Sequence, residues 1–425
     1  MQSTQRFRLD PEVARFSVSP EEIGPVNPRH RPRAVGEVIG QPRAVEALKM
    51  AVAIRAKGYN VFVAGLSGTG KRSTVMRFLR EQPFDPLRLR DIVAVSNFSR
   101  PESPRILYFS AGDGRRFRRR LSDLVSGLQE EMPGALDQGA YREQRDGVML
   151  ETEQRESSEL GRFEQQLNEA GFTMVQLGEG SEQRSDIALL MDGEPVEIEQ
   201  LGSLVQSGVL DDAEAGRRRQ QYYRFMDAMN RMFVSLRGER VGAETQLREL
   251  QREAVRPMLD RAVDQVIDEF VGEPIITHLQ QMRDDMAENF SLFLADDPEK
   301  EDDRQVELLR YSANVLVDHA ETDRTPVIFE SRPDYHKLFG GQDANQELEG
   351  RHGFLSLRAG SLLAASGGYL VLRAEDVLSQ DEVWHGLKRA IQDEVTEIRT
   401  PPTPYGPPVQ SMKPEPIEVH LKVIM

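Results

Sequence analysis

The segment YNVFVAGLSGTGK, residues 59–71, joins a short apolar run to a glycine-rich turn that ends in lysine. Its last seven residues match the first seven positions of the phosphate-binding pattern G-x-x-x-x-G-K-[ST], and residues 73–80 continue with helical spacing. Glycine suits such a turn because backbone N–H groups must point inward to hold phosphate oxygens, and a Cβ would obstruct them. The order strand, loop, helix therefore predicts an α/β fold with a phosphate site.

A nucleoside triphosphate is the ligand that this pattern predicts, with ATP as the expected cofactor. Lys71 would reach the β- and γ-phosphates from the start of a helix whose dipole also favours anions. The alternative is a glycine-rich turn that binds no ligand. The candidate binding residues of the turn and the helix start are Gly65, Ser67, Gly68, Thr69, Gly70, Lys71 and Ser73.

Magnesium placement departs from the pattern at two positions. Arg72 occupies the eighth position, where Ser or Thr supplies a hydroxyl to Mg²⁺, and a guanidinium cannot ligate a cation. Ser73 follows, but one residue along a helix is a rotation of about 100°, so its hydroxyl does not simply replace the missing ligand. The apolar strand GGYLVL at 367–372, which should end in an acidic metal ligand, is followed by Arg373.

Glu375 and Asp376 come one turn later and are the candidate catalytic carboxylates of an ATPase site. The competing interpretation is an exposed acidic pair that caps a helix running toward Trp384, because acidic side chains favour a helix N-terminus. Both departures exchange a cation ligand for arginine. They predict a nucleotide site whose metal chemistry has been lost or reassigned. The expected cofactors are therefore ATP and Mg²⁺, and both arginines put the binding of these cofactors in question.

The charge balance argues against nucleic acid as a partner. The 425 residues include 54 basic and 70 acidic side chains, a formal net charge of −16. Such a field repels phosphate backbones unless a local basic patch overrides it. A nucleic-acid motor would have to use the one basic run of the chain. We favour a solvated helix face or a subunit contact for that run, because it has no interleaved aromatic residues beyond Phe117. The run consists of Arg115, Arg116, Arg118, Arg119 and Arg120.

Other compositional features point to a cytoplasmic protein without a membrane partner or a metal site. The chain has no cysteine, which excludes disulfides and thiolate zinc sites. Residues 1–16 contain no apolar leader segment, and no stretch approaches the roughly 18 apolar residues of a membrane span. The seven histidines are dispersed without metal-ligand spacing.

The pattern along the chain predicts a parallel-sheet core split by a helical insertion. Short apolar runs at 59–64, 91–97, 326–330, 354–358, 367–373 and 418–424 indicate strands, and apolar residues at 45, 48, 52 and 56 indicate a helix that stops at Gly58. Neither strand-rich half alone supplies a covered sheet. The expected divisions are an N-terminal arm at 1–36, a first core half at 37–112, the insertion at 113–325 and a second core half at 326–425, with a proline-rich loop at 401–416.

Within the insertion, apolar stripes at helical spacing predict long amphipathic, coiled-coil-like helices. One stripe runs from Leu160 to Leu167, a methionine-rich stripe from Tyr222 to Leu236 and a third from Leu279 to Phe290. FTMVQL at 172–177 and DIALLM at 186–191 predict a small β-hairpin among these helices. The methionine-rich stripe is either helix-hairpin core or a flexible apolar surface that holds unfolded chains.

Several motifs, in this order, resemble the AAA+ module of Lon-like proteases, and in particular a LonB-like branch with a long helical insertion. They are Gly40-Gln41, the turn at 65–71, NFSRPESPRIL at 97–107, FESRPDYHKLFG at 329–340, LRAGSLLAASGGYLVL at 357–372, WHGLKRAI at 384–391 and PEPIEVHLKVI at 414–424.

This resemblance implies a homo-hexameric ring that recruits unfolded or damaged proteins and threads them to a Ser-Lys protease domain, whose catalytic residues are not expected among residues 1–425. It also implies that Gln41 lies near the adenine. The alternative function, which Arg72 and Arg373 favour, is a ring scaffold that does not hydrolyse ATP. An aromatic segment with Tyr335 and Phe339 could either hold substrate in a pore or form a packing turn.

Overall fold

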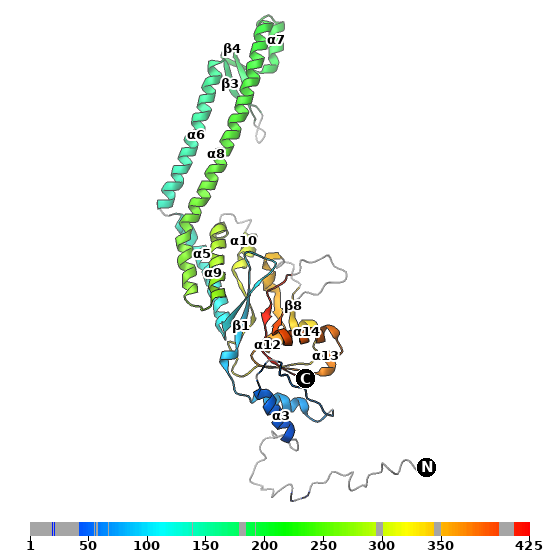
Figure 1. Cartoon of the computed structure of the whole chain (residues 1–425). Helices are drawn as coiled ribbons and strands as arrows, with labels where there is room; N and C mark the ends of the chain where they lie inside the picture. Colours follow the sequence, from blue (N-terminus) through cyan, green and yellow to red (C-terminus); the bar gives the residue numbers. More distant parts are fainter. Residues whose placement is uncertain are drawn as a thin grey trace, which may run out of the picture.

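The computed structural model describes residues 19, 21, 42–54, 56, 58–66, 68–137, 139–177, 184–191, 193–294, 301–343, 350–398 and 412–425. A mixed α/β body carries a long helical arm (Figure 1). Apart from residues 19 and 21, the N-terminal arm expected at 1–36 lies outside the described residues, and so does residue 41. The same holds for residues 401–411 of the proline-rich loop.

A parallel sheet holds the segment that leads into the glycine-rich turn. Its strands, in order, are β13 (Lys422–Ile424), β10 (Tyr369–Leu372) and β7 (Val327–Glu330). Residues 59–64, expected as a strand, form only one parallel bridge, from Val61 to Ile424, beside β13. Backbone hydrogen bonds from Val61 to Val423 and from Val63 to Met425 extend this pairing. The glycine-rich turn therefore follows the sheet edge at which β10 and β7 also end.

Helices cover both faces of this sheet, which is why its strands are mostly apolar. On one face, buried side chains of α3 (Pro42–Ala53) and α4 (Lys71–Arg80) pack on Val371 and Ile424. On the other face, Leu370 and Val423 lie in a core with α14 (Asp381–Asp393). Helix α3 ends at Ala53, before the predicted stop at Gly58.

The run at 91–97 is a strand, as predicted, but it belongs to a second sheet and not to the parallel sheet of the core. Strand β1 (Arg90–Val95) pairs antiparallel with β2 (Arg105–Ser110) and with β6 (Ala313–Val317). Its side chains alternate between two cores: Ile92 and Ala94 face the α14 side, whereas Val93 and Val95 face the base of the arm. A continuous apolar run reports burial on both faces and does not distinguish parallel from antiparallel pairing. Because β6 lies within 113–325, this sheet crosses the expected division after residue 112.

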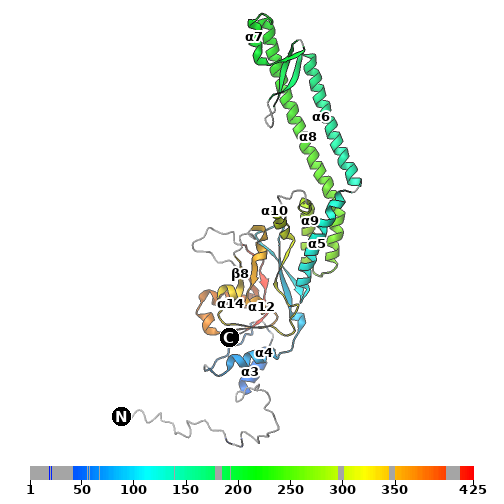
Figure 2. The ribbon, with the colours of Figure 1, turned by 180° about the vertical axis from the view of Figure 1, so that it is seen from behind.

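The arm is built from long helices (Figures 1 and 2). They are α5 (Asp113–Leu136), α6 (Gly139–Glu169), α8 (Asp212–Ile267) and α9 (Glu273–Glu288). Near the body, α8 packs with α5 and α9 in one apolar core, and farther out it runs beside α6. The third predicted stripe, Leu279 to Phe290, lies in this basal core.

At the tip of the arm, the predicted hairpin is present and has a third strand. The tip contains β3 (Phe172–Leu177), β4 (Arg184–Met191), β5 (Glu194–Val196) and α7 (Leu201–Gln206). Tyr222 and Met229 of the methionine-rich stripe are buried against this sheet, and the Tyr222 hydroxyl donates to Asp186 Oδ1 over 3.0 Å. The tip therefore supports the core interpretation of the stripe.

Two predicted strands are shorter than expected. Residues 354–356 belong to the 3-10 helix η9 (Gly350–Ser356), and only β9 (Leu357–Ala359) follows as a strand, paired with β8 (Gly340–Gln342). The run at 418–424 divides between β12 (Ile417–Glu418), which pairs with β11 (Val395–Thr396), and β13. The remaining short elements are η2 (Pro86–Arg88), η4 (Ile198–Gln200), η5 (Phe290–Phe293), α10 (Glu301–Leu308), η7 (Leu309–Tyr311), α11 (Tyr335–Phe339), α12 (Ser361–Ala364) and α13 (Ala374–Leu378).

Candidate nucleotide site

The glycine-rich turn has the backbone that its sequence predicts. Gly68 and Gly70 have φ values of 82° and 73°, in the left-handed region that other residues seldom adopt. A Cβ at either position would meet no heavy atom within 4 Å, so conformation rather than crowding requires glycine there. The Thr69 hydroxyl donates to the Leu66 carbonyl over 2.9 Å and holds the turn closed. This backbone suits close approach by a phosphate group.

Lys71 is the first residue of α4, and its ammonium lies within the turn. Its Nζ donates to the carbonyl oxygen of Gly65 and, over 2.7 Å, to that of Leu66. The stem of the side chain passes beneath Gly65, where a Cβ would lie 3.5 Å from Lys71 Cδ. The turn therefore places one positive charge among its own carbonyl groups, where bound phosphate oxygens would compete for it.

Helix α4 is basic although the chain is acidic. Its ten residues include four cations and no carboxylate. Among the described residues, none of these four cations forms an ion pair. A cavity of about 470 Å³ lies between this helix and β7. Its lining residues are Arg72, Ser73, Met76, Arg77, Arg80 and Phe329. Positive charge concentrated beside a helix N-terminus favours an anionic ligand.

The side chain at the eighth pattern position is held by an aromatic ring. The Arg72 guanidinium carbon lies 5.0 Å from the centroid of the Phe329 ring, which belongs to β7. Ser73, the nearest hydroxyl along α4, is exposed and lines the same cavity. No local sequence pattern predicts the contact with Phe329, because the two residues are more than 250 positions apart in the chain.

Glu375 and Asp376 lie at the same edge of the sheet as the turn but on a different strand connection. They are in the first turn of α13, after β10, and β13 lies between β10 and the segment 59–64. Glu375 is exposed, and Asp376 Oδ2 is buried without a hydrogen-bond partner among the described residues. No hydrogen bond or ion pair within the described part of the chain joins either carboxylate to Lys71 or Ser73.

Two further candidate residues, Gln41 and Ser67, lie outside the described residues. The part of the chain that the structure describes contains no group of three or more His, Asp or Glu side chains arranged to hold a metal ion. Within that same part, no helix is both long enough and apolar enough to cross a membrane.

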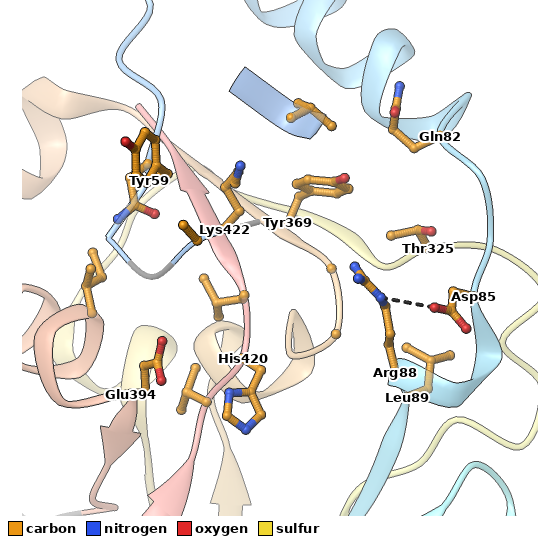
Figure 3. Close-up of a pocket in the computed structure, with 18 of the residues that line it drawn as sticks. Tyr59, Gln82, Asp85, Arg88, Leu89, Thr325, Tyr369, Glu394, His420 and Lys422 are labelled. Atoms are coloured by element: carbon orange, nitrogen blue, oxygen red, sulfur yellow. Dashed lines mark hydrogen bonds and ion pairs between the residues drawn. The ribbon is translucent and has the colours of Figure 1, made fainter. Parts of the chain in front are cut away.

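A second cavity lies at the opposite edge of the parallel sheet, where β10 and β13 begin (Figure 3). It has a volume of about 690 Å³ and is lined by Tyr59, Arg88, Tyr369 and His420, among others. Lys422, also in the lining, donates to the carbonyl groups of Ala51 and Ile54 at the end of α3, and burial lowers its pKa. This cavity is therefore separate from the glycine-rich turn, and the sequence did not predict it.

Comparison with known families adds to this geometry. A family model described as "LonB-like, AAA domain" matches residues 323–425, and one described as "Lon-like LonC helical domain" matches residues 91–124. Both matched families are Lon-like. The matches are consistent with a Lon-like AAA+ module, as the motif resemblance predicted.

The two matches cover separate parts of the chain. The LonB-like match spans the strands from β7 to β13 with the helices between them, and the LonC match spans β1, β2 and the first half of α5. The glycine-rich turn lies outside both matched ranges. A search of curated proteins finds no match.

Proposed function

We propose that this chain is the nucleotide-binding AAA+ module of a Lon-like protease. In this proposal the chain assembles into a homo-hexameric ring in the cytoplasm, and the ring recruits unfolded proteins and threads them toward a Ser-Lys protease domain. The Lon-like family matches support the AAA+ part of the proposal. The remaining parts follow from the resemblance and from the helical arm.

The position of the Lys71 ammonium is the main observation in support of nucleotide binding. It is inside a left-handed glycine turn, at the N-terminus of a helix with three further cations. A phosphate chain would replace the carbonyl partners of Lys71 and accept hydrogen bonds from the backbone N–H groups of the turn. The residues present therefore fit the triphosphate of ATP.

The residues fit Mg²⁺ poorly, so the proposal assigns no step to the metal. A Mg²⁺ site in such a turn needs a hydroxyl at the eighth position and a carboxylate after the central strand. Here those positions hold Arg72, which is against Phe329, and the exposed Arg373. The guanidinium of Arg72 could instead balance phosphate charge directly, since it lies on the same helix turn as Lys71.

The same observation supports the second candidate function, a ring scaffold that binds nucleotide weakly or without hydrolysis. The two candidates differ in turnover. A fluorescent ATP analogue titrated with and without EDTA measures binding and its dependence on metal, and phosphate release by the full-length assembly measures hydrolysis. Binding that depends on Lys71 with rapid, Mg²⁺-dependent turnover would support the motor and exclude the scaffold. Binding without turnover would support the scaffold, and no binding would exclude a nucleotide site.

A further inference from the structure

A three-stranded sheet lies at the tip of the arm, where Figure 1 labels β3 and β4. Its two edges are of different kinds. The strand order is β3, β4, β5, so β3 and β5 are the edge strands. Edge strands present unpaired backbone N–H and C=O groups, and proteins commonly protect them with proline, charge or short length.

The β5 edge is protected. This strand has only three residues, Glu194–Val196, and its middle residue is Pro195, which pairs with Leu190. In the antiparallel alternation, Leu189 and Met191 are the β4 residues whose N–H and C=O groups face β5, so the backbone of Pro195 faces outward. Proline has no N–H to offer at that position. Glu194 adds an exposed charge.

The β3 edge has none of these protections. The six-residue strand FTMVQL contains no proline, glycine or charge. A hydrogen bond of 2.9 Å from Leu190 N to Gly171 O sets the alternation with β4. It directs the N–H and C=O groups of Thr173 and Val175 toward β4, and those of Phe172, Met174 and Gln176 away from it. Phe172 is fully buried, so the accessible part of this edge is at Met174 and Gln176. No strand in the described part of the chain pairs with this side of β3.

The carboxylates at the tip favour a cationic polypeptide as the partner of this sheet. Residues 185–216, which contain β5, α7 and most of β4, include eight carboxylates and no Lys, Arg or His. Several of these carboxylates are exposed, as are Leu190 at 39% and Val209 at 61%. Arg184 and Arg217 to Arg219 flank this stretch, and Arg217 and Arg218 pair with Glu214. The other exposed carboxylates between them attract cationic segments over about 8 Å at physiological ionic strength, and Leu190 and Val209 offer apolar contacts.

We propose that the β3 edge binds extended polypeptide segments by strand addition, with a preference for segments that combine basic and β-branched residues. Backbone hydrogen bonds to Met174 and Gln176 would provide affinity that is largely independent of sequence, and the acidic tip would provide the charge preference. This inference rests on the proposed recruitment of unfolded proteins and adds the site and the binding mode.

The test uses the full chain and a fluorescein-labelled decapeptide of alternating Val and Thr with two Lys residues. Met174→Pro removes an outward N–H without removing a bond to β4, and Met174→Leu is its matched control. We expect anisotropy titrations to show at least tenfold weaker binding by M174P and less than twofold change by M174L. A peptide N-methylated at four consecutive residues should also bind the unaltered protein at least tenfold more weakly, because it cannot pair as a strand.

Charge and folding are checked separately. A peptide with Glu in place of Lys should bind several-fold more weakly, and circular dichroism reports whether M174P folds. If M174P does not fold, the N-methylated peptide decides the question on the unaltered protein. Equal binding of the methylated and unmethylated peptides would overturn strand addition. If an unfolded protein still bound through the arm in that case, recruitment itself would stand, whereas no binding of either ligand would remove the recruitment proposal too.

Discussion

The Arg72 guanidinium lies over the Phe329 ring, 5.0 Å from its centroid, and so links the start of α4 to the strand β7. A cation over an aromatic ring contributes about 0.5–1 kcal/mol at a partly exposed site. The contact explains how arginine is accommodated beside a phosphate-binding turn: its charge has a partner other than a metal ion. It also suggests how the metal chemistry of the turn can be restored.

Arg72→Ser should make nucleotide binding more dependent on Mg²⁺. The substitution supplies the hydroxyl of the complete pattern and removes the cation that substitutes for metal charge. We expect the ratio of ATP-analogue affinity with Mg²⁺ to that with EDTA to rise at least fivefold relative to the unaltered chain. Arg72→Ala, which removes the cation without adding a hydroxyl, is the control. Equal ratios for the Ser and Ala variants would contradict a metal-ligand role for this position.

Lys71→Ala should weaken binding of the ATP analogue at least tenfold. The ammonium is the charged group inside the turn, and a charge-assisted hydrogen bond to phosphate contributes more than a neutral one. Arg77→Ala, which removes a cation from the same helix outside the turn, should change affinity less than threefold. If both variants lost affinity equally, the overall charge of α4 rather than the turn would hold the nucleotide.

Asp91→Asn should destabilise the junction between β1, α5 and the end of β6. The buried carboxylate accepts backbone N–H groups of Gly112 at 2.8 Å, Gly114 at 3.0 Å and His319 at 2.8 Å. An amide has one acceptor oxygen, so its NH₂ group would oppose at least one of these donors. We expect urea unfolding to show a loss of about 1–3 kcal/mol. Asp113→Asn, at a partly exposed position at the start of α5, should cost less.

His278→Phe should reduce the acid sensitivity of the fold. His278 is buried in the basal core and stacked on Phe98 with ring centroids 5.5 Å apart, and burial lowers its pKa from 6.5 to about 3. The nearby Arg105 contributes in the same direction. Below pH 6.5, His278 therefore binds a proton in the unfolded chain, whereas in the folded chain it stays neutral until about pH 3.

This difference in pKa makes the free energy of unfolding fall as the pH falls. Stability due to neutral His278 is fully present above pH 6.5 and is lost as the pH falls toward 3, by up to about 1.4 kcal/mol per pH unit. Unfolding free energies measured between pH 7 and pH 4 should fall less steeply for His278→Phe than for the unaltered chain. His385→Asn, at an exposed position, should leave the slope unchanged. Parallel slopes for all three proteins would show that His278 titrates normally.

Replacing residues 140–248 by a glycine-rich linker should remove the outer arm and leave the body folded. The outer arm has its own apolar core around Phe163, Phe172 and Tyr222, whereas α5 and the end of α8 pack in the basal core. Removal up to residue 315 would also delete part of β6 and so take away one of the two strands that pair with β1. We expect thermal unfolding of the body to remain cooperative and binding of an unfolded protein to be lost. Undiminished binding would place recruitment elsewhere.

The sequence by itself determined the features that depend on near neighbours. The glycine spacing at 65–70 already required left-handed backbone, and the order of apolar residues already required long helices and a hairpin at 172–191. These patterns are local because a turn, a helix face or a hairpin is formed by residues within a few positions of one another. The resemblance to Lon-like AAA+ modules rested on motifs of the same local kind.

Only the tertiary structure decided which distant segments meet. Val93 pairs with Val315, more than two hundred positions later, so 91–97 joins an antiparallel sheet although its apolar run fits a parallel strand equally well. Arg72 meets Phe329, while Glu375 and Asp376 stay on a different strand connection from the turn. The edges of the tip sheet likewise depend on which strand occupies the centre. Burial drives apolar strands into a sheet without specifying a partner, and the partner is chosen by the packing of the whole chain.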